Sequence, residues 1–314
     1  MIKNLAIKGG GVKGIAYVGA LEVLDKQGLF QPIERVAGTS AGALMALMIS
    51  CGYDVPGIER LMRSIEFAKF KNGWNPLRLF TSYGLHSGDY ILQFARQVLE
   101  ESPLGLDGTA SFTDLLNHGG KELYVFSCNI NTQEIREFSA DKSPEQSVAE
   151  AVRASMSIPF FFKAFTFSRG DDHIYVDGGT IYNYPLSLFD NKRRFTYDGI
   201  VNMESLGLYL TSVHLDEAGQ IRYEDGKLKR MERRAKNRLR FNQFFHFSKD
   251  VFESMVDSQD VVILDDNEQV TRSILINDLG YPATDFDLKK HDLDALVHSG
   301  KTCAEEYFQR SHRL

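Results

Sequence analysis

The strongest constraint on the fold is a pair of glycine-rich turns near the amino terminus, each set between a short apolar segment and a segment with helical spacing. Asn4–Lys8 is followed by the turn Gly9–Gly14 and then by Ile15–Lys26, where apolar residues recur at helical intervals. Arg35–Ala37 leads in the same way into Gly38–Gly42. A buried strand that passes through a tight turn into a helix is the repeating unit of a parallel sheet covered by helices. The sequence therefore predicts an α/β fold.

The rest of the chain continues this alternation. No internal repeat, low-complexity tract or proline-rich linker interrupts it, and α/β domains often exceed the usual size of about 100–200 residues. We therefore expect one domain over residues 1–314. Further strands are expected at Glu122–Asn129, Glu134–Ser139, Ile174–Val176, Gly207–Thr211 and Arg272–Asn277, and helices at Ala43–Cys51, Gly57–Phe67, Gly88–Glu101, Ser111–Leu116, Glu145–Met156 and Leu288–Arg310.

Composition excludes several classes of protein. The formal charge of −6 gives no reason to expect binding to nucleic acid. Cys51, Cys128 and Cys303 are widely spaced and form no metal or redox motif, so we expect buried, reduced thiols. The first apolar run is too short for a signal peptide, and no run approaches the roughly 18 residues of a membrane span. We expect a cytoplasmic protein with no cleaved signal peptide or transmembrane helix, and at most peripheral contact with membranes.

One segment differs in character from the rest. Lys227–Arg240 carries eight basic residues and one acidic residue, and five phenylalanines follow within 241–252. One interpretation is a solvated basic face that leads into a helix with its aromatic residues in the core. The other is a patch over 227–252 that contacts anionic lipid, because each basic residue near such a surface contributes about 1 kcal/mol and aromatic side chains enter the interface. We expect 227–258 to form a helical insertion or lid-like segment within the domain.

Gly38–Thr39–Ser40–Ala41–Gly42 has the pattern G-x-S-x-G between a strand and a helix. A nucleophilic serine stands on a sharp turn that exposes its hydroxyl, and the glycines two residues before and after it relieve the crowding of that turn. The following helix directs its amino terminus at the site and favours developing negative charge. Ser40 is therefore a candidate nucleophile. The alternative is that Ser40 only caps the helix.

The turn Gly9–Gly10–Gly11–Val12–Lys13–Gly14 is a candidate oxyanion hole. Glycine backbone can direct its N–H groups toward a ligand, and such donors stabilise the tetrahedral intermediate of acyl transfer. The turn also matches the dinucleotide-binding pattern G-x-G-x-x-G, but that pattern requires an acidic residue at the end of the next strand, where this chain has Gly38–Thr39–Ser40. It is not a Walker-type phosphate loop, since Gly14 rather than serine or threonine follows Lys13.

Asp177–Gly178–Gly179 follows the expected strand Ile174–Val176. A serine hydroxyl is a poor nucleophile until a base takes its proton, and Asp177 is the candidate base. An unperturbed aspartate has a pKa of about 3.9 and is ionised at neutral pH. Two alternatives remain: an aspartate before glycine often only forms a turn, and a histidine is the base in many serine hydrolases. The histidines after Asp177 lie in no short motif at a strand end: His214, His246, His291, His298 and His312.

In this order, the three motifs resemble the patatin-like phospholipase family, whose pattern is a G-G-G-x-[KR]-G loop, a G-x-S-x-G turn and a later D-G-[GA]. Residues 83–89, 154–160 and 284–288 resemble further blocks of that family, so the resemblance covers nearly the whole chain. It implies a three-layer sandwich with a mostly parallel central sheet and covering helices. It also implies a Ser-Asp dyad that uses neither a metal nor an organic cofactor.

Carried over to this chain, the resemblance makes Ser40 the nucleophile and Asp177 the general base. Gly9–Gly11, with the backbone of Val12 and Lys13, would form the oxyanion hole. Two roles stay open for Lys13, which either holds the glycine loop or adds positive charge. The apolar segments Ala43–Cys51 and Pro159–Phe162 either line an acyl pocket or belong to the core.

The implied function is that of a lipid acyl hydrolase of the phospholipase A or lysophospholipase type, acting on phospholipid or lysophospholipid through an acyl-enzyme on Ser40. One alternative is an acyltransferase with the same intermediate; Thr39 argues against it, because acyl-carrier transacylases of this fold have histidine before the serine. Another is a non-catalytic lipid-binding signalling module, against which the intact motifs argue. Whether an activator is required is left open by the sequence.

Overall fold

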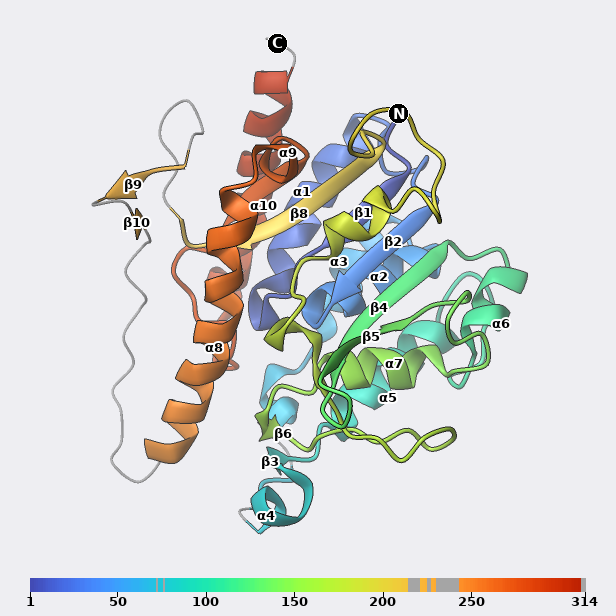
Figure 1. Cartoon of the computed structure of the whole chain (residues 1–314), viewed down its shortest axis with the longest axis vertical. Helices are drawn as coiled ribbons and strands as arrows, with labels where there is room; N and C mark the ends of the chain where they lie inside the picture. Colours follow the sequence, from blue (N-terminus) through green and yellow to red (C-terminus); the bar gives the residue numbers. More distant parts are fainter. Residues whose placement is uncertain (72, 76, 214–220, 225–226, 230–242, 312–314) are drawn as a thin grey trace.

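The computed structural model describes residues 1–311 apart from 72, 76, 214–220, 225–226 and 230–242 (Figure 1). Its central sheet has seven strands in the order β11–β8–β1–β2–β4–β5, with β7 also paired to β4. Five strands are parallel, whereas β5 and β7 run antiparallel to β4. The predicted α/β fold with a mostly parallel sheet is confirmed. The strands are β1 (Asn4–Ile7), β2 (Arg35–Thr39), β4 (Glu122–Asn129), β5 (Glu134–Phe138), β7 (Tyr175–Asp177), β8 (Ser205–Thr211) and β11 (Ser273–Asn277).

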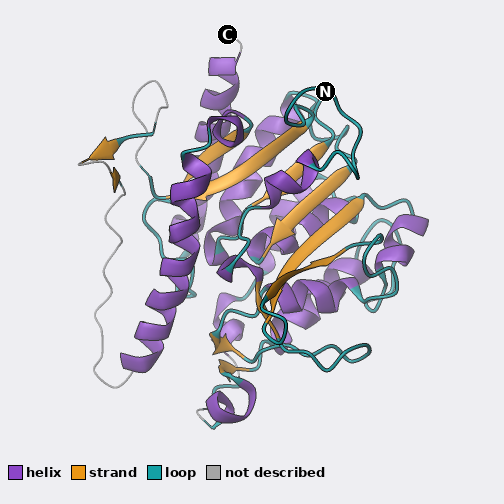
Figure 2. Cartoon of the chain, in the orientation of Figure 1, coloured by secondary structure: helices purple, strands orange, loops and turns teal. Residues whose placement is uncertain are grey.

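Helices cover both faces of this sheet (Figure 2). The alternation of side chains along each strand explains why two cores exist: Leu5 and Ile7 of β1 join a larger core, and Ala6 joins a smaller one on the opposite face. The larger core lies under α1 (Ala16–Lys26), α2 (Ala41–Ser50), α3 (Val55–Ser64), α5 (Asp89–Glu100), α7 (Val148–Ser155) and α10 (Lys290–Ser311). The smaller core lies under the 3₁₀ helix η4 (Pro185–Asp190) and the ends of α8 (Gln243–Leu264) and α9 (Asn267–Thr271).

The first and last helices of the larger layer pack at backbone distance. A Cβ atom on Gly19 of α1 would lie 1.9 Å from the carbonyl oxygen of Val297, and one on Gly300 of α10 would lie 1.9 Å from that of Ala16. Glycine is therefore required on both helices at this crossing. This contact fixes the carboxyl-terminal helix against the helix that follows the glycine turn.

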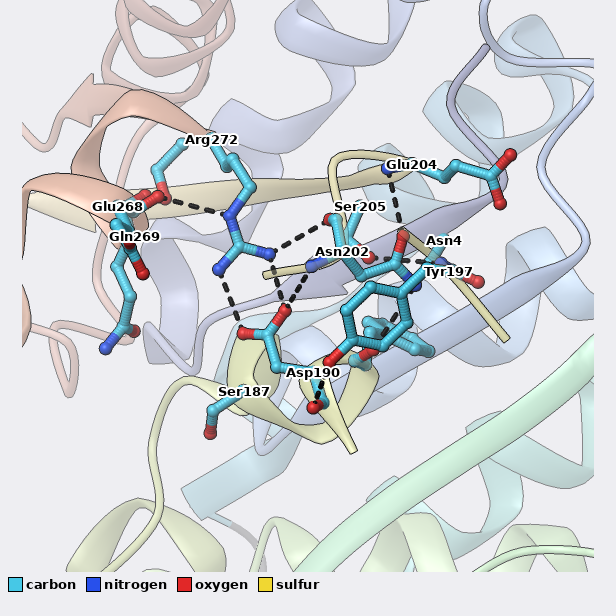
Figure 3. A network of polar contacts seen from close by, with 12 residues as sticks. Asn4, Ser187, Asp190, Tyr197, Asn202, Glu204, Ser205, Glu268, Gln269 and Arg272 are labelled. Atoms are coloured by element: carbon cyan, nitrogen blue, oxygen red, sulfur yellow. Dashed lines mark hydrogen bonds and ion pairs between the residues drawn. The ribbon is translucent and has the colours of Figure 1, made fainter. Parts of the chain in front are cut away.

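A partly buried ion pair connects elements at the amino end of the sheet (Figure 3). Arg272, just before β11, donates through two nitrogens to both carboxylate oxygens of Asp190 in η4, each at 2.9 Å. The same guanidinium donates to the carbonyl oxygen of Asn202, 3.1 Å away, and Asp190 accepts the N–H of Asn202 at 2.8 Å. Because Asn202 lies in the loop that enters β8, the network joins η4, β8 and β11 at the amino ends of the strands, away from the candidate site at their carboxyl ends.

Several short elements were not expected from the sequence. A two-stranded parallel sheet pairs β3 (Gly84–His86) with β6 (Phe160–Phe162), and β9 (Tyr223–Glu224) pairs with β10 (Lys227–Leu228). In Figure 1, α4 (Arg78–Ser82), β3 and β6 lie together at the end of the molecule away from both termini. The 3₁₀ helices η1 (Gly11–Ile15), η2 (Phe67–Lys71) and η3 (Gly178–Thr180) complete the described elements, together with α6 (Phe112–Asn117), which confirms the helix expected at Ser111–Leu116.

The segment 227–258 is described only in part. It contains β10 and most of α8, while residues 230–242 lie outside the described residues. The lid-like role of this segment and its membrane contact over 227–252 therefore stay predictions. Among the helices of the described ranges, none combines the length and the hydrophobicity that crossing a bilayer requires.

Candidate active site

The sheet brings the two candidate catalytic residues together through a shared neighbour, β4. Thr39 at the end of β2 pairs with Phe126 of β4, and Asp177 at the end of β7 pairs with the next residue, Ser127. Since β5 occupies the other edge of this part of β4, β2 and β7 share one edge and meet end to end. Their carboxyl ends face each other, which places Ser40 beside Asp177.

Ser40 stands on a strained turn that only a glycine-flanked sequence can form. Its φ of 54° and ψ of −126° lie outside the regions that L-residues ordinarily occupy. A Cβ atom on Gly38 would lie 2.2 Å from the carbonyl oxygen of Gly42, and one on Gly42 would lie 2.3 Å from that of Ile7. The Ser40 N–H donates to the hydroxyl of Ser155, 2.8 Å away, which donates in turn to the carbonyl oxygen of Phe126 at 2.5 Å.

The Ser40 hydroxyl does not cap the helix that follows it. No hydrogen bond joins it to the backbone of α2. It donates instead to Oδ2 of Asp177 at 2.7 Å. The helix-cap interpretation of Ser40 is therefore wrong, and the hydroxyl is oriented by a carboxylate.

Asp177 is fully buried and held on both oxygens. Oδ1 accepts the N–H of Gly179 at 2.7 Å, and Oδ2 accepts the Ser40 hydroxyl. Burial raises the pKa of Asp177 to about 7, although the hydrogen bonds from Ser40 and Gly179 and the positive charge of Arg153 all act to lower it. The expectation of an ordinary, fully ionised aspartate at neutral pH is corrected by this burial.

The glycine turn follows β1 and so lies at the same carboxyl end of the sheet as Ser40 and Asp177. Several of its N–H groups hold the turn in shape. Gly9 donates to the carbonyl oxygen of Asn183 at 3.0 Å, Val12 to that of Ala283 at 2.9 Å, and Lys13 to that of Gly10 at 3.3 Å. Within the described residues, the N–H groups of Gly10 and Gly11 have no such backbone acceptor. Gly11 has a φ of +57°, and a Cβ atom there would lie 2.0 Å from the Ala283 carbonyl oxygen.

Two lysines anchor this turn from either side. The Lys13 ammonium lies 2.6 Å from Oδ2 of Asp278, which ties the turn to the loop after β11. Lys8, directly before the turn, is buried and lies 2.6 Å from Oδ1 of Asp260 on α8. Of the two roles left open for Lys13, the geometry favours that of holding the glycine loop.

Comparison with known proteins identifies the family. The model of patatin-like phospholipases matches residues 5–190, more than half of the 314 residues. The chain belongs to the patatin-like phospholipase family. Membership places it among the enzymes that hydrolyse ester bonds with a serine.

Relatives of this patatin-like chain differ in how much they share with it. An uncharacterised protein R571 of Acanthamoeba polyphaga mimivirus is 33% identical over 60% of the chain and 62% of its own length. The uncharacterised YqhO of Bacillus subtilis is 29% identical over 96% of both chains. A cUMP-AMP-activated phospholipase of Escherichia coli is 27% identical over 58% of this chain and 55% of its own.

A solved structure supports the fold assignment. VipD of Legionella pneumophila superposes with a TM-score of 0.60 over 98% of this chain and 67% of its own, at 17% identity. At that identity, the likeness concerns the fold alone. It extends to the carboxyl-terminal part of the chain that the family model leaves unmatched.

A narrow apolar cavity of about 30 Å³ opens beside the nucleophile. Its wall includes Ser40 and Gly11, together with Leu44 of α2 and Phe162 of β6. Most of Ala43–Cys51 is plain core, with Leu44 as its contribution to this cavity. The cavity therefore places apolar surface in contact with both the nucleophile and the glycine turn.

A second cavity of about 530 Å³ lies on the base side of the site. Val176 and Thr180, on either side of the Asp177 motif, line it together with residues of α8 such as Phe252 and Met255. Phe162 lines both cavities. Pro159, Phe160 and Phe162 of the predicted Pro159–Phe162 segment thus contribute to an apolar cavity.

Several supporting residues carried no signal in the sequence. On α8, the side-chain amide of Gln259 donates to the carbonyl oxygen of Gly179 and accepts the N–H of Asn183, each at 2.8 Å. Asn183 in turn pairs with Gly9 through its backbone and side chain. One side chain therefore holds the base motif and the glycine turn together. Ser155 lies in the segment 154–160 of the family resemblance, which was the only sign of its role.

Within the described residues, no histidine hydrogen-bonds the Ser40 hydroxyl or lines the cavity beside it. His291 and His298 are exposed on α10, and the imidazoles of His214, His246 and His312 lie outside the described part of the chain. The described partner of the Ser40 hydroxyl is a carboxylate.

Proposed function

We propose that this chain hydrolyses fatty-acyl esters of phospholipids or lysophospholipids through an acyl-enzyme on Ser40, with Asp177 as the general base. The observation that carries the proposal is the 2.7 Å hydrogen bond from the Ser40 hydroxyl to Asp177 at the wall of an apolar cavity. Ionised Asp177 takes the Ser40 proton as the oxygen attacks the ester carbonyl. The alcohol or lysolipid leaves with that proton, and a water activated by Asp177 then releases the fatty acid.

The N–H groups of Gly10 and Gly11 are the donors that we assign to the oxyanion. Gly11 lines the cavity beside Ser40, and in the described part of the chain neither N–H has a backbone acceptor, unlike those of Gly9, Val12 and Lys13. Donors fixed before the reaction stabilise a developing oxyanion without reorganising. The sequence predicted an oxyanion hole over Gly9–Gly14, and this assignment limits its donors to the N–H groups of two glycines.

The larger apolar cavity supports a lipid rather than a polar ester. The cavity beside Ser40, at about 30 Å³, is too small for an acyl chain, whereas the apolar cavity of about 530 Å³ beside the Asp177 motif has the volume that such a chain needs. Fatty-acyl chains gain free energy from such burial, at about 0.8 kcal/mol per methylene. Ordinary water-soluble esters have too little apolar surface to fill the larger cavity.

The test is fatty-acid release from mixed phospholipid vesicles by the wild-type chain, Ser40→Ala and Asp177→Asn. We expect each variant to lose at least about 10⁴-fold in rate while circular dichroism remains that of the folded chain. Ser50→Ala is the matched control, since it removes a buried hydroxyl at the far end of the same helix. Substantial turnover by either dyad variant would contradict the assignment.

Two additions to the same assay separate the remaining possibilities. Lysolipid added as an acceptor would yield a new diacyl lipid if the chain transfers its acyl group instead of releasing a fatty acid. The Escherichia coli relative is named as activated by cUMP-AMP, so the assay is run with and without cyclic dinucleotides. A wild-type chain that is active only with one of them would place an activator among its partners.

A further inference from the structure

A cluster of large apolar side chains stands exposed before β3. Trp74, Leu77 and Phe80 are 64%, 71% and 83% exposed, and Tyr83 directly after α4 is 53% exposed. Single exposed apolar residues are ordinary, but a group of this size on one short segment marks an interaction surface. Because these side chains are not packed in the core, we expect them to contact a binding partner.

This exposed segment is fastened to the rim of the larger apolar cavity. The N–H of Asn75 donates to the carbonyl oxygen of Leu85 in β3, and Gly84 of β3 pairs with Phe160 of β6. Tyr83 and Phe160 both line the cavity, and Phe160 is itself 41% exposed. Figure 1 shows α4, β3 and β6 together at the end of the molecule away from both termini.

The charge around this segment has the sign opposite to that of the whole chain. Residues 67–88 contain three basic residues and no acidic one, whereas the chain carries a net charge of −6. Lys69 and Lys71 form exposed ion pairs with Glu66 and Asp287 that lie outside the segment, and Arg78 donates to a backbone carbonyl. Exposed pairs of this kind contribute little, so anionic groups can compete for these lysines.

We infer that Trp74, Leu77, Phe80, Tyr83 and Phe160 form a docking surface for an anionic lipid bilayer. Aromatic and aliphatic side chains enter the boundary between head groups and acyl chains, while neighbouring basic residues attract anionic head groups. Docking there would set the mouth of the 530 Å³ cavity against the membrane. This inference rests on the proposed function and extends it: the lipid substrate would be taken from a bilayer.

The chain carries its own reporter for this surface, because Trp74 is its only tryptophan. The experiment uses the full chain with Ser40→Ala, so that vesicles are not consumed, and measures tryptophan emission and vesicle co-sedimentation. Vesicles of phosphatidylcholine alone are compared with vesicles that also contain phosphatidylglycerol. We expect sedimentation and a shift of the emission to shorter wavelength with the anionic vesicles, both weakened by salt.

Leu77→Ser/Phe80→Ser tests the surface without touching either cavity. It should weaken binding to anionic vesicles by at least about tenfold, since two apolar side chains leave the interface. The matched control is Ile200→Ser, which removes an equally exposed apolar side chain from the loop before β8, at the amino ends of the parallel strands. It should bind as the parent chain does.

Three outcomes would overturn the inference. Vesicle binding without a change in emission, and undiminished in the double variant, would place the contact elsewhere, for example at 227–252. No binding to any vesicle would exclude bilayer docking. An emission shift that rises with protein concentration in the absence of lipid would make the surface a contact between two copies of the chain.

Hydrolysis of a soluble short-chain ester separates this inference from the proposed function. With Ser40 restored, the double variant should hydrolyse that ester at the wild-type rate and release fatty acid from anionic vesicles at least about tenfold more slowly. A wild-type chain that docks but hydrolyses neither substrate would leave docking intact and contradict the proposed function.

Discussion

The nucleophile side and the base side of the site are held in place by different means. Around Ser40, backbone packs on backbone: Gly38 meets Gly42, and Gly42 meets the end of β1, at distances that no side chain fits. Around Asp177, side chains from other elements hold the backbone in place through hydrogen bonds. Gln259 of α8, for example, joins Gly179 to Asn183. The first arrangement depends on residue types that cannot vary, and the second depends on hydrogen bonds that a distant helix supplies.

The two sides also differ electrically. The N–H of Ser40 is bonded to the neutral hydroxyl of Ser155, and among the described residues no ionisable side chain bonds the backbone of this turn. The base side carries a fully buried carboxyl with a raised pKa and, nearby, the buried guanidinium of Arg153. The nucleophile side therefore sets geometry, and the base side sets the pH range over which that geometry is used.

The largest effect should come from breaking the backbone contact on the nucleophile side. Gly38→Ala puts a methyl group 2.2 Å from the Gly42 carbonyl oxygen, so the turn must open. We expect ester hydrolysis to fall at least about 100-fold and the free energy of unfolding to fall by about 1–3 kcal/mol. Both are measured on purified protein, by initial rates and by urea denaturation.

Gly28→Ala is the control for that substitution. Gly28 has a φ of +70° but no heavy atom near the position of a Cβ, so alanine there adds backbone strain of about 1 kcal/mol without a clash. Activity should stay at the wild-type level. Equal losses of activity in the two variants would show that the close packing at Gly38 has no special role.

The base side is tested by the pH dependence of hydrolysis. Asp177 accepts a proton only when it is ionised, and burial raises its pKa to about 7. The rate constant kcat/KM for a soluble ester should therefore rise with pH, reach half of its plateau near pH 7, and be about a tenth of the plateau at about pH 6. A half-maximum near pH 4 would indicate an ordinary aspartate and contradict the effect ascribed to burial.

A smaller effect is expected where α8 supports the base motif. Gln259→Ala removes the hydrogen bonds to Gly179 and Asn183 but leaves the dyad itself intact. We expect kcat to fall by about three- to tenfold, since losing a supporting hydrogen bond costs about 1 kcal/mol, with little change in KM. Ser258→Ala, an exposed neighbour on the same helix, is the control and should match the wild type; a Gln259 variant of wild-type rate would show that α8 does not position the site.

The same contrast explains what sequence reasoning found. Where backbone packs closely on backbone, the sequence must have glycine at fixed positions. The motifs Gly38–Gly42, Gly9–Gly14 and Asp177–Gly178–Gly179 could therefore be recognised from the sequence, together with the strands and helices that flank them. Gln259 and Arg153 act through hydrogen bonds or charge across the fold. A glutamine in the middle of a helix has no pattern that distinguishes it from any surface residue.

The elements at the rim were missed for a different reason. β3 and β6 have three residues each and pair across more than 70 positions of sequence, so neither shows the alternation that indicates a strand. The raised pKa of Asp177 was also beyond the sequence, because it results from burial by several elements. The resemblance to a family supplied the roles of Ser40 and Asp177, and the fold supplied their distance.

The central claim is that Asp177 activates Ser40, and covalent labelling tests it most directly. A fluorophosphonate that mimics an acyl ester is incubated with the wild-type chain, Ser40→Ala and Asp177→Asn, and the adduct is followed by intact-mass spectrometry and peptide mapping. We expect one adduct per chain on Ser40 in the wild type, none in Ser40→Ala, and labelling at least about 100-fold slower in folded Asp177→Asn. Labelling of Asp177→Asn at the wild-type rate, or of any residue other than Ser40, would contradict it.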